Sequence, residues 1–293
     1  MAKTVWVFPG QGSQATGMGV DLQDWPEAQQ RLAEAEAFLG WSVLERCQAD
    51  LETLSQTINT QPCLYVLEAI LSDRLKQQGE QPDAVAGHSL GEYSALYTAG
   101  VFDFATGLQL VQKRAELMQA ASGGKMAALI GFDAEALAAA IANTEGVVLA
   151  NDNSAAQVVI SGTPAAVDAI LATVKSKRAV PLTVSGAFHS PFMAEAATTF
   201  AATLAAVDFQ DAQVPVLSNV SATPSTDAAV LKQNLLQQMT GSVRWRETCL
   251  AIEALGVEEL VEVGPGKVLT GLMKRTCPAI GLRNVGTAAD LAV

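Results

Sequence analysis

One serine lies in a sequence pattern that favours nucleophilic catalysis. Residues 87–91 read Gly-His-Ser-Leu-Gly, a G-x-S-x-G pattern with Ser89 at its centre. An apolar run precedes it and small residues follow, which predicts a strand, a sharp turn and a helix. Flanking glycines let backbones pass closely in such a turn, and the hydroxyl is exposed beside free N–H groups at the helix start. The pattern predicts that Ser89 attacks an acyl group; the alternative is a tight turn without a catalytic role.

The choice of base is narrow because the chain has only two histidines, His88 and His189. Histidine is the usual base for a serine nucleophile. Successive side chains at the end of a strand diverge, so we expect His88 to point away from the Ser89 hydroxyl. His189, in the loop 186–191, is therefore the predicted base, with an ordinary loop histidine as the alternative.

Arg114 is predicted to lie on the apolar face of a helix that follows Asp103. Leu110 and Met118 lie one turn before and after it, so neither of those neighbours offers an acid. A buried guanidinium requires an anionic partner. The sequence therefore leaves two interpretations open: an anion-binding arginine, or a stem packed on the core whose head reaches water or an acid on another element.

The elements that position these residues alternate between β and α, which implies a mainly parallel sheet covered on both faces. Strands of this part are predicted over residues 4–8, 84–87, 214–218, 258–263 and 280–283. Helices are predicted from Thr60 to Gly79, from 91 onward, and over 103–121, 193–206, 230–239, 244–255 and 267–276. Between them, strands 126–130, 147–151, 157–162 and 179–184 and helices 134–142 and 164–177 give the order βαββαβ, the ferredoxin-like unit. We predict an α/β core of residues 1–122 and 190–293 with residues 123–189 inserted.

Composition excludes several classes of protein. The 293 residues include 18 Lys and Arg against 30 Asp and Glu, a net charge of −12, and 49% are hydrophobic. This composition is far from that of disordered chains, and the acidity disfavours nucleic-acid binding, which needs a basic face. Apolar runs are too short for a membrane span or a signal-peptide core. The four scattered cysteines favour reduced structural thiols, and we expect a cytoplasmic protein.

Four motifs occur in order along the chain: residues 10–14 (Gly-Gln-Gly-Ser-Gln), 87–92 (Gly-His-Ser-Leu-Gly-Glu), 188–190 (Phe-His-Ser) and 262–266 (Glu-Val-Gly-Pro-Gly). Together they resemble the malonyl-CoA:acyl-carrier-protein transacylases of dissociated fatty-acid synthesis, over essentially the whole chain. The resemblance implies an α/β-hydrolase-like core with a ferredoxin-like insertion. It also implies a monomer that moves malonyl from malonyl-CoA to the phosphopantetheine thiol of acyl carrier protein. The transfer would be ping-pong, through a serine acyl-enzyme, with neither metal nor redox cofactor.

The resemblance also implies residue roles. Ser89 would attack the thioester, His189 would accept and return its proton, and the Gln238 carbonyl would orient His189. The N–H groups of Gln11 and Leu90 would stabilise the oxyanion. Substrate contacts are predicted for Arg114, which would pair with the malonyl carboxylate, and for Gln61, Met118, Asn153 and Phe188. The chain departs from the family pattern in having Ala187 where proline is common and Gly241-Ser242 where Asn-Pro is frequent.

Three other functions compete with this interpretation. A serine esterase shares G-x-S-x-G but usually has its histidine near the C-terminus, whereas about a third of this chain follows His189. A catalytically silent carrier-binding scaffold would not need the Ser, His and Arg set. A phosphate-binding loop at residues 10–19 would lack its Lys-Ser/Thr ending.

The acidic chain must attract anionic coenzyme A and an acidic carrier locally if the resemblance holds. Three basic spots could do so, at residues 175–178, at Arg244 with Arg246, and at Lys274 with Arg275.

Overall fold

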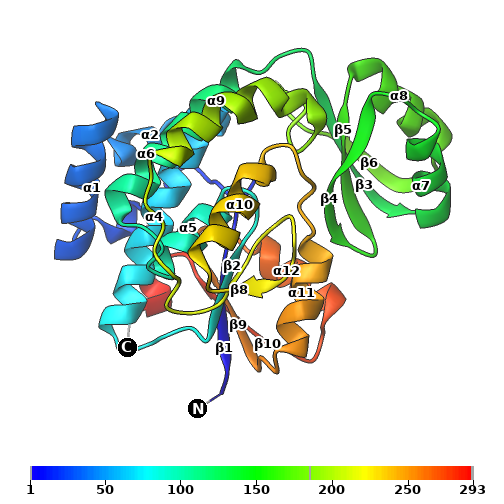
Figure 1. Ribbon diagram of the computed structural model, residues 1–293. Coiled ribbons are helices and arrows are strands. Elements are labelled where there is room, and N and C mark those ends of the chain that lie inside the picture. The colour runs from blue at the N-terminus through cyan, green and yellow to red at the C-terminus, as the bar shows by residue number, and fades with distance from the viewer. Residues whose placement is uncertain (1, 185, 292–293) are drawn as a thin grey trace.

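Two separate β-sheets organise the chain in the computed structural model, which describes residues 2–184 and 186–291 (Figure 1). The larger sheet has the order β10-β9-β1-β2-β7-β8. Its strands are β1 (Thr4–Phe8), β2 (Ala84–Gly87), β7 (Val216–Leu217), β8 (Pro224–Ser225), β9 (Glu259–Val263) and β10 (Gly281–Val285). All neighbours pair in parallel except β7 and β8, which pair antiparallel. The predicted α/β fold with a mainly parallel sheet is confirmed.

Helices cover both faces of this sheet, as the apolar character of β1 requires. Val5 and Val7 pack into one apolar cluster and Trp6 and Phe8 into another, because successive side chains of a strand point to opposite faces. The first face is covered by α11 (Trp245–Ala254) and α12 (Val268–Thr276). The second is covered by α4 (Thr57–Gln77), α5 (Gly91–Thr98) and α6 (Phe104–Ala120) (Figure 1).

The start predicted for α4 is wrong by one turn. The helix begins at Thr57, not at Thr60, because the Gln56 carbonyl already accepts the Thr60 N–H across 2.8 Å. The Thr60 hydroxyl does not cap the helix but donates to the Leu54 carbonyl at 2.5 Å. Pro62 consequently lies inside the helix, where its missing N–H removes one backbone hydrogen bond.

The smaller sheet is antiparallel, with the order β4-β5-β3-β6. It is built from β3 (Lys125–Phe132), α7 (Ala134–Ala142), β4 (Val147–Ser154), β5 (Gln157–Gly162), α8 (Pro164–Thr173) and β6 (Ser176–Pro181). This is the predicted βαββαβ order, and it has an apolar core of its own that includes Leu129, Ile160 and Ile170. The helix predicted to reach residue 177 stops at Thr173, because Ser176 already pairs with Phe132.

The remaining elements surround the larger sheet. They are α1 (Pro26–Leu39), α2 (Val43–Cys47), α3 (Leu51–Ser55), α9 (Ala194–Ala205) and α10 (Ala228–Gln238), with 3-10 turns at Val20–Leu22, Pro191–Met193 and Ala288–Leu291. The helices α1 to α3 and the short strand β8 were not predicted from the sequence. All four cysteines are buried as free thiols. Across the described ranges, no helix combines the length and apolarity needed to cross a membrane, and no three His, Cys, Asp or Glu side chains form a metal-binding group.

Backbone hydrogen bonds link β4 of the smaller sheet to Val243, which lies between α10 and α11. The Val243 N–H donates to the Ala150 carbonyl at 2.8 Å, and the Asp152 N–H donates to the Val243 carbonyl at 2.9 Å. Arg246 adds an ion pair to Asp152. The smaller sheet is therefore held against the segment that leads into α11.

Candidate active site

The turn after β2 has the strained geometry that the G-x-S-x-G pattern predicts. Ser89 has a φ of 53°, in the left-handed region that non-glycine residues rarely adopt. A Cβ on Gly87 would lie 1.9 Å from the Gly91 carbonyl group, and one on Gly91 would lie 2.0 Å from the Phe8 carbonyl oxygen. Both glycines are therefore required for the strand and helix to pass this closely. The predicted strand–turn–helix is confirmed.

His189 lies against the Ser89 hydroxyl, with its Nε2 2.8 Å from Ser89 Oγ. Its Nδ1 lies 2.9 Å from the Gln238 carbonyl oxygen and 3.2 Å from that of Gly241. Because carbonyls can only accept, Nδ1 carries the proton and Nε2 presents its lone pair to Ser89. Burial, followed by the nearby Arg114 charge, lowers the pKa of His189 to about 3. The imidazole is thus neutral and able to accept a proton near pH 7.

His88 has a different partner, as expected from its place at the strand end. Its Nε2 donates to Asn153 Oδ1 at 2.8 Å, and its ring lies 5.6 Å from that of Trp245. Asn153 is therefore engaged by His88. Within the described chain it does not line the hollow at Ser89, whereas Asn151 does. The substrate contact of Asn153 stays a prediction, and in this structure its amide oxygen accepts from His88.

Arg114 is buried to 1% exposure on α6, in agreement with its apolar stripe. Its guanidinium donates to Gln61 Oε1 at 2.8 Å, to Ser89 Oγ at 3.0 Å and to Gln238 Oε1 at 3.1 Å. Its Nε has no acceptor within the described residues, and none of their acids lies within 4.0 Å of it. A buried cation held only by neutral groups has free capacity for an anionic ligand.

A hollow of about 80 Å³, here called the Ser89 hollow, brings most of the predicted site residues together. It is lined by Gln11, Gln61, His88, Ser89, Leu90, Arg114, Met118, Met126, Asn151, Leu182, Val184, Phe188 and His189. Gln61 and Met118 are themselves linked, since Gln61 Nε2 donates to Met118 Sδ at 3.3 Å. Of the predicted site residues, Gln238 and Asn153 do not line the Ser89 hollow.

Two backbone N–H groups at the Ser89 hollow are unused. Neither the Gln11 nor the Leu90 N–H finds an acceptor in the part of the chain that the structure describes. The Gln11 side chain is turned outward and donates to Thr57 Oγ1 at 3.2 Å. Both N–H groups are therefore available to an oxyanion that forms beside Ser89.

Two residues of the site were missed as functional from the sequence, Asn219 and Glu92. Asn219 Oδ1 accepts the Ser89 N–H at 2.7 Å, and its Nδ2 donates to the Gly87 carbonyl at 2.5 Å. Glu92 Oε2 accepts the Asn219 N–H at 3.2 Å and Gln238 Nε2 at 2.8 Å. Burial raises the pKa of Glu92, and these hydrogen bonds oppose that rise. The strand pairing could have indicated Asn219, because this residue follows β7 and β7 is the parallel neighbour of β2.

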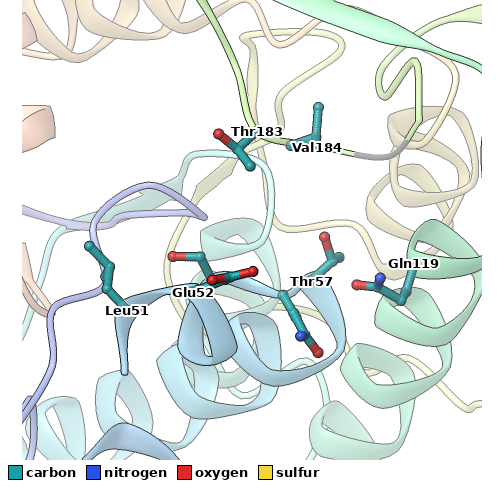
Figure 2. A pocket seen from close by; sticks show the side chains of 8 residues that line it. Leu51, Glu52, Thr57, Gln119, Thr183 and Val184 are labelled. Carbon is teal, nitrogen blue, oxygen red and sulfur yellow. The ribbon is translucent and has the colours of Figure 1, made fainter. Parts of the chain in front are cut away.

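A wider hollow of about 540 Å³, here called the outer hollow, adjoins the site (Figure 2). Figure 2 shows Thr183 and Val184 on one side of it and Leu51, Glu52, Thr57 and Gln119 on the other. Val184 lines both hollows. The outer hollow thus leads along α3 and the start of α4 to the neighbourhood of Ser89.

Comparisons with known proteins agree with this geometry. Residues 5–289 match the acyl transferase domain family. The chain is 63% identical to the malonyl CoA-acyl carrier protein transacylase of Synechocystis sp. PCC 6803 over 289 residues, 99% of each protein. The crystal structure of that enzyme gives a TM-score of 0.98, with 99% of both chains covered. A malonyl-transacylase solved in complex with a type II PKS acyl-carrier protein is 39% identical, with a TM-score of 0.93 over 99% of this chain and 98% of that one. The chain therefore belongs to the acyl transferase family, in the group of the malonyl CoA-acyl carrier protein transacylases.

Proposed function

We propose that the chain transfers malonyl from malonyl-CoA to the phosphopantetheine thiol of acyl carrier protein, through an ester on Ser89, and so supplies fatty-acid chain extension. One observation carries the proposal. Ser89 Oγ contacts both a neutral imidazole at 2.8 Å and a buried guanidinium at 3.0 Å. A base and a carboxylate receptor on the same oxygen suit a thioester whose acyl group ends in a carboxylate.

In the first half-reaction, Ser89 Oγ attacks the thioester carbonyl carbon while His189 Nε2 takes the hydroxyl proton. The Gln11 and Leu90 N–H groups stabilise the tetrahedral oxyanion. The carbon–sulfur bond then breaks, His189 returns its proton to the departing coenzyme A sulfur, and malonyl is left as an ester on Ser89.

In the second half-reaction, the carrier's thiol gives its proton to His189 and attacks the ester carbonyl. The carbon–oxygen bond breaks, Ser89 regains the proton, and the carrier leaves as its malonyl thioester. Each half-reaction exchanges one acyl bond for another with no change of oxidation state, so the proposed cycle needs no redox cofactor, and its acid–base and oxyanion steps use protein groups without a metal.

Arg114 would select the acyl group by binding the malonyl carboxylate. Its position is fixed from two sides by Gln61 and Gln238, so little side-chain freedom is lost when the anion binds. A short acyl chain on Ser89 then places its carboxylate beside the guanidinium. Phe188, which is buried and lines the same hollow, would limit the room for a branched acyl group.

The outer hollow would hold the pantetheine arm of either thioester, because it is the larger of the two hollows and shares Val184 with the Ser89 hollow. The fold is assigned correspondingly. Residues 1–122 and 190–293 would form an α/β-hydrolase-like core and residues 123–189 a ferredoxin-like insertion, for which the strand order β4-β5-β3-β6 is the supporting observation. Residues 1, 185, 292 and 293 of these ranges lie outside the described residues.

Intact-mass spectrometry after mixing with malonyl-CoA tests the proposal. The unaltered chain should gain one malonyl group, and Ser89→Ala should gain none. Ser122→Ala, which alters an exposed serine, is the matched control and should behave as the unaltered chain does. Rapid release of free malonate without carrier protein would show a hydrolase and overturn the transfer.

A further inference from the structure

The side-chain amide of Gln238 separates two buried, oppositely charged residues. Its Oε1 accepts from Arg114 at 3.1 Å, and its Nε2 donates to Glu92 Oε2 at 2.8 Å. Arg114 is 1% exposed and Glu92 is fully buried. Within residues 2–184 and 186–291 the two charges make no ion pair of 4.0 Å or less.

This separation leaves the guanidinium without a direct carboxylate partner inside the protein. A direct pair would occupy the guanidinium with an internal carboxylate, in the geometry that Arg and carboxylates prefer. With the amide between them, Glu92 still compensates the Arg114 charge through a low-dielectric interior. The guanidinium meanwhile keeps unused donors, including its Nε.

We propose that Glu92 is a specificity-determining residue that acts on the substrate's carboxylate through Gln238 and Arg114. Resting on the function proposed above, the inference assigns to these three residues, here called the Arg114–Gln238–Glu92 relay, the control of anion affinity. Glu92 lowers the affinity of Arg114 for a carboxylate to a level at which the acyl group can leave. It does so without touching the substrate.

The relay is connected to the rest of the site, which explains why the spacer is a glutamine. Gln238 Nε2 also donates to the Ser89 carbonyl at 2.7 Å, and the Gln238 carbonyl holds His189. A carboxylate at position 238 could accept from Arg114 but could not donate to Ser89 or Glu92. The amide alone serves both neighbours at once.

Glu92→Gln tests the relay with little change of shape. Both N–H groups that bind Glu92 donate to the same oxygen, Oε2, and an amide oxygen at that place can accept both. The new NH₂ would take the place of Oε1, which accepts no hydrogen bond from a described residue. The substitution therefore removes a charge while both hydrogen bonds that the Glu92 side chain accepts from Asn219 and Gln238 can persist.

We expect Glu92→Gln to lower the Kd of free malonate, measured by calorimetry, by about fivefold. The ratio of kcat/KM for malonyl-CoA to that for acetyl-CoA should rise by about the same factor, because acetyl has no carboxylate. Glu135→Gln removes one exposed acid on α7 and is the control for net charge. It should leave both quantities unchanged.

Two further measurements keep the test decisive. In an Arg114→Met background, Glu92→Gln should no longer change malonate binding, since the relay acts through the guanidinium. Circular dichroism and thermal unfolding establish that each variant is folded. If Glu92→Gln leaves the Kd unchanged, or slows malonyl and acetyl transfer equally, Glu92 is a structural support and the relay is wrong. Failure of the unaltered chain to form a malonyl-enzyme would instead overturn the proposed function, while malonate binding still reports on the relay.

Discussion

Arg114 donates to the Ser89 hydroxyl oxygen across 3.0 Å, so the buried cation of α6 touches the very atom that the β2–α5 turn exposes. An acyl group on Ser89, as proposed above, would therefore form beside a positive charge that is already desolvated. Arg114 and Ser89 are 25 positions apart in the sequence. Their contact joins the strained turn after β2 to α6, the second helix that follows it.

Replacement of Arg114 by methionine should separate malonyl from acetyl transfer. The apolar side chain fills a similar volume but cannot bind a carboxylate, so we expect malonyl transfer to fall by about 100-fold or more. Acetyl transfer should persist or rise. Steady-state kinetics with both thioesters measure the ratio.

Arg114→Lys is the matched control for charge. It keeps the cation but loses the planar fork, so its malonyl rate should lie between those of the methionine variant and the unaltered chain. Equal loss of malonyl and acetyl transfer in Arg114→Met would mean that the residue only supports Ser89.

His189 should remain neutral far below the usual pH range of histidine, because its pKa is lowered to about 3. With only two histidines in the chain, their ring protons can be resolved by NMR and assigned by His88→Asn. We expect no titration of His189 between pH 7 and 5 and a higher pKa in Arg114→Met, which lacks the neighbouring charge. A titration near 6.5 in the unaltered chain would contradict the buried, neutral base.

The low pKa of His189 also makes the stability of the native state depend on pH. Between about pH 3 and 6.5 the unfolded chain binds a proton at this histidine and the native chain does not, so the native state loses stability as the pH falls. From pH 7 to 5 the loss attributable to His189 should be about 2 kcal/mol. Urea unfolding at both pH values should show a smaller difference for His189→Asn. An identical difference in both proteins would be inconsistent with the low pKa.

Gly91 and Gly271 should respond oppositely to alanine. The new Cβ at Gly91 would lie 2.0 Å from the Phe8 carbonyl oxygen, so we expect a severe loss of stability or no folded protein. At Gly271, in α12, a Cβ meets nothing within 4 Å. Alanine there should stabilise the helix by roughly 0.5–1 kcal/mol. Thermal unfolding compares the two, and a well-folded Gly91→Ala would contradict the close crossing of β1 and α5.

The basic spots differ in how far they are compensated. Arg244 pairs with Glu247, and Arg246 pairs with Asp152. Lys177 and Arg178 are exposed at the start of β6 and form no ion pair with a described residue. If an acidic carrier docks there, reversing both charges should raise its KM several-fold at low salt, with the effect fading as ionic strength rises. Reversing Lys274 and Arg275 changes the net charge by the same amount at another candidate spot, and equal effects at both would indicate only a net-charge effect.

Local sequence determined much of what could be predicted. The strands β1, β2 and β5 and the cap by Asp103, which accepts the Thr106 N–H at 2.8 Å, follow from short-range patterns. The crowded glycines at Ser89 were also foreseeable, because only glycine permits that crossing.

Other features depend on contacts between distant segments. Asn219 lies 130 positions from Ser89, and only the pairing of β2 with β7 brings its amide to the turn. The contact between His88 and Asn153 likewise joins residues 65 positions apart, one in the turn after β2 and the other in β4. Local pattern carries no information about such partners, whereas sheet topology does.

The backbone ladder between Ala150, Asp152 and Val243 has a mechanical consequence. Val243 lies two residues beyond Gly241 and five beyond Gln238, the residues whose carbonyls hold the His189 imidazole. The segment 238–243 therefore both supports the imidazole and carries the hydrogen bonds to β4, so the position of the base and the position of the smaller sheet are mechanically linked.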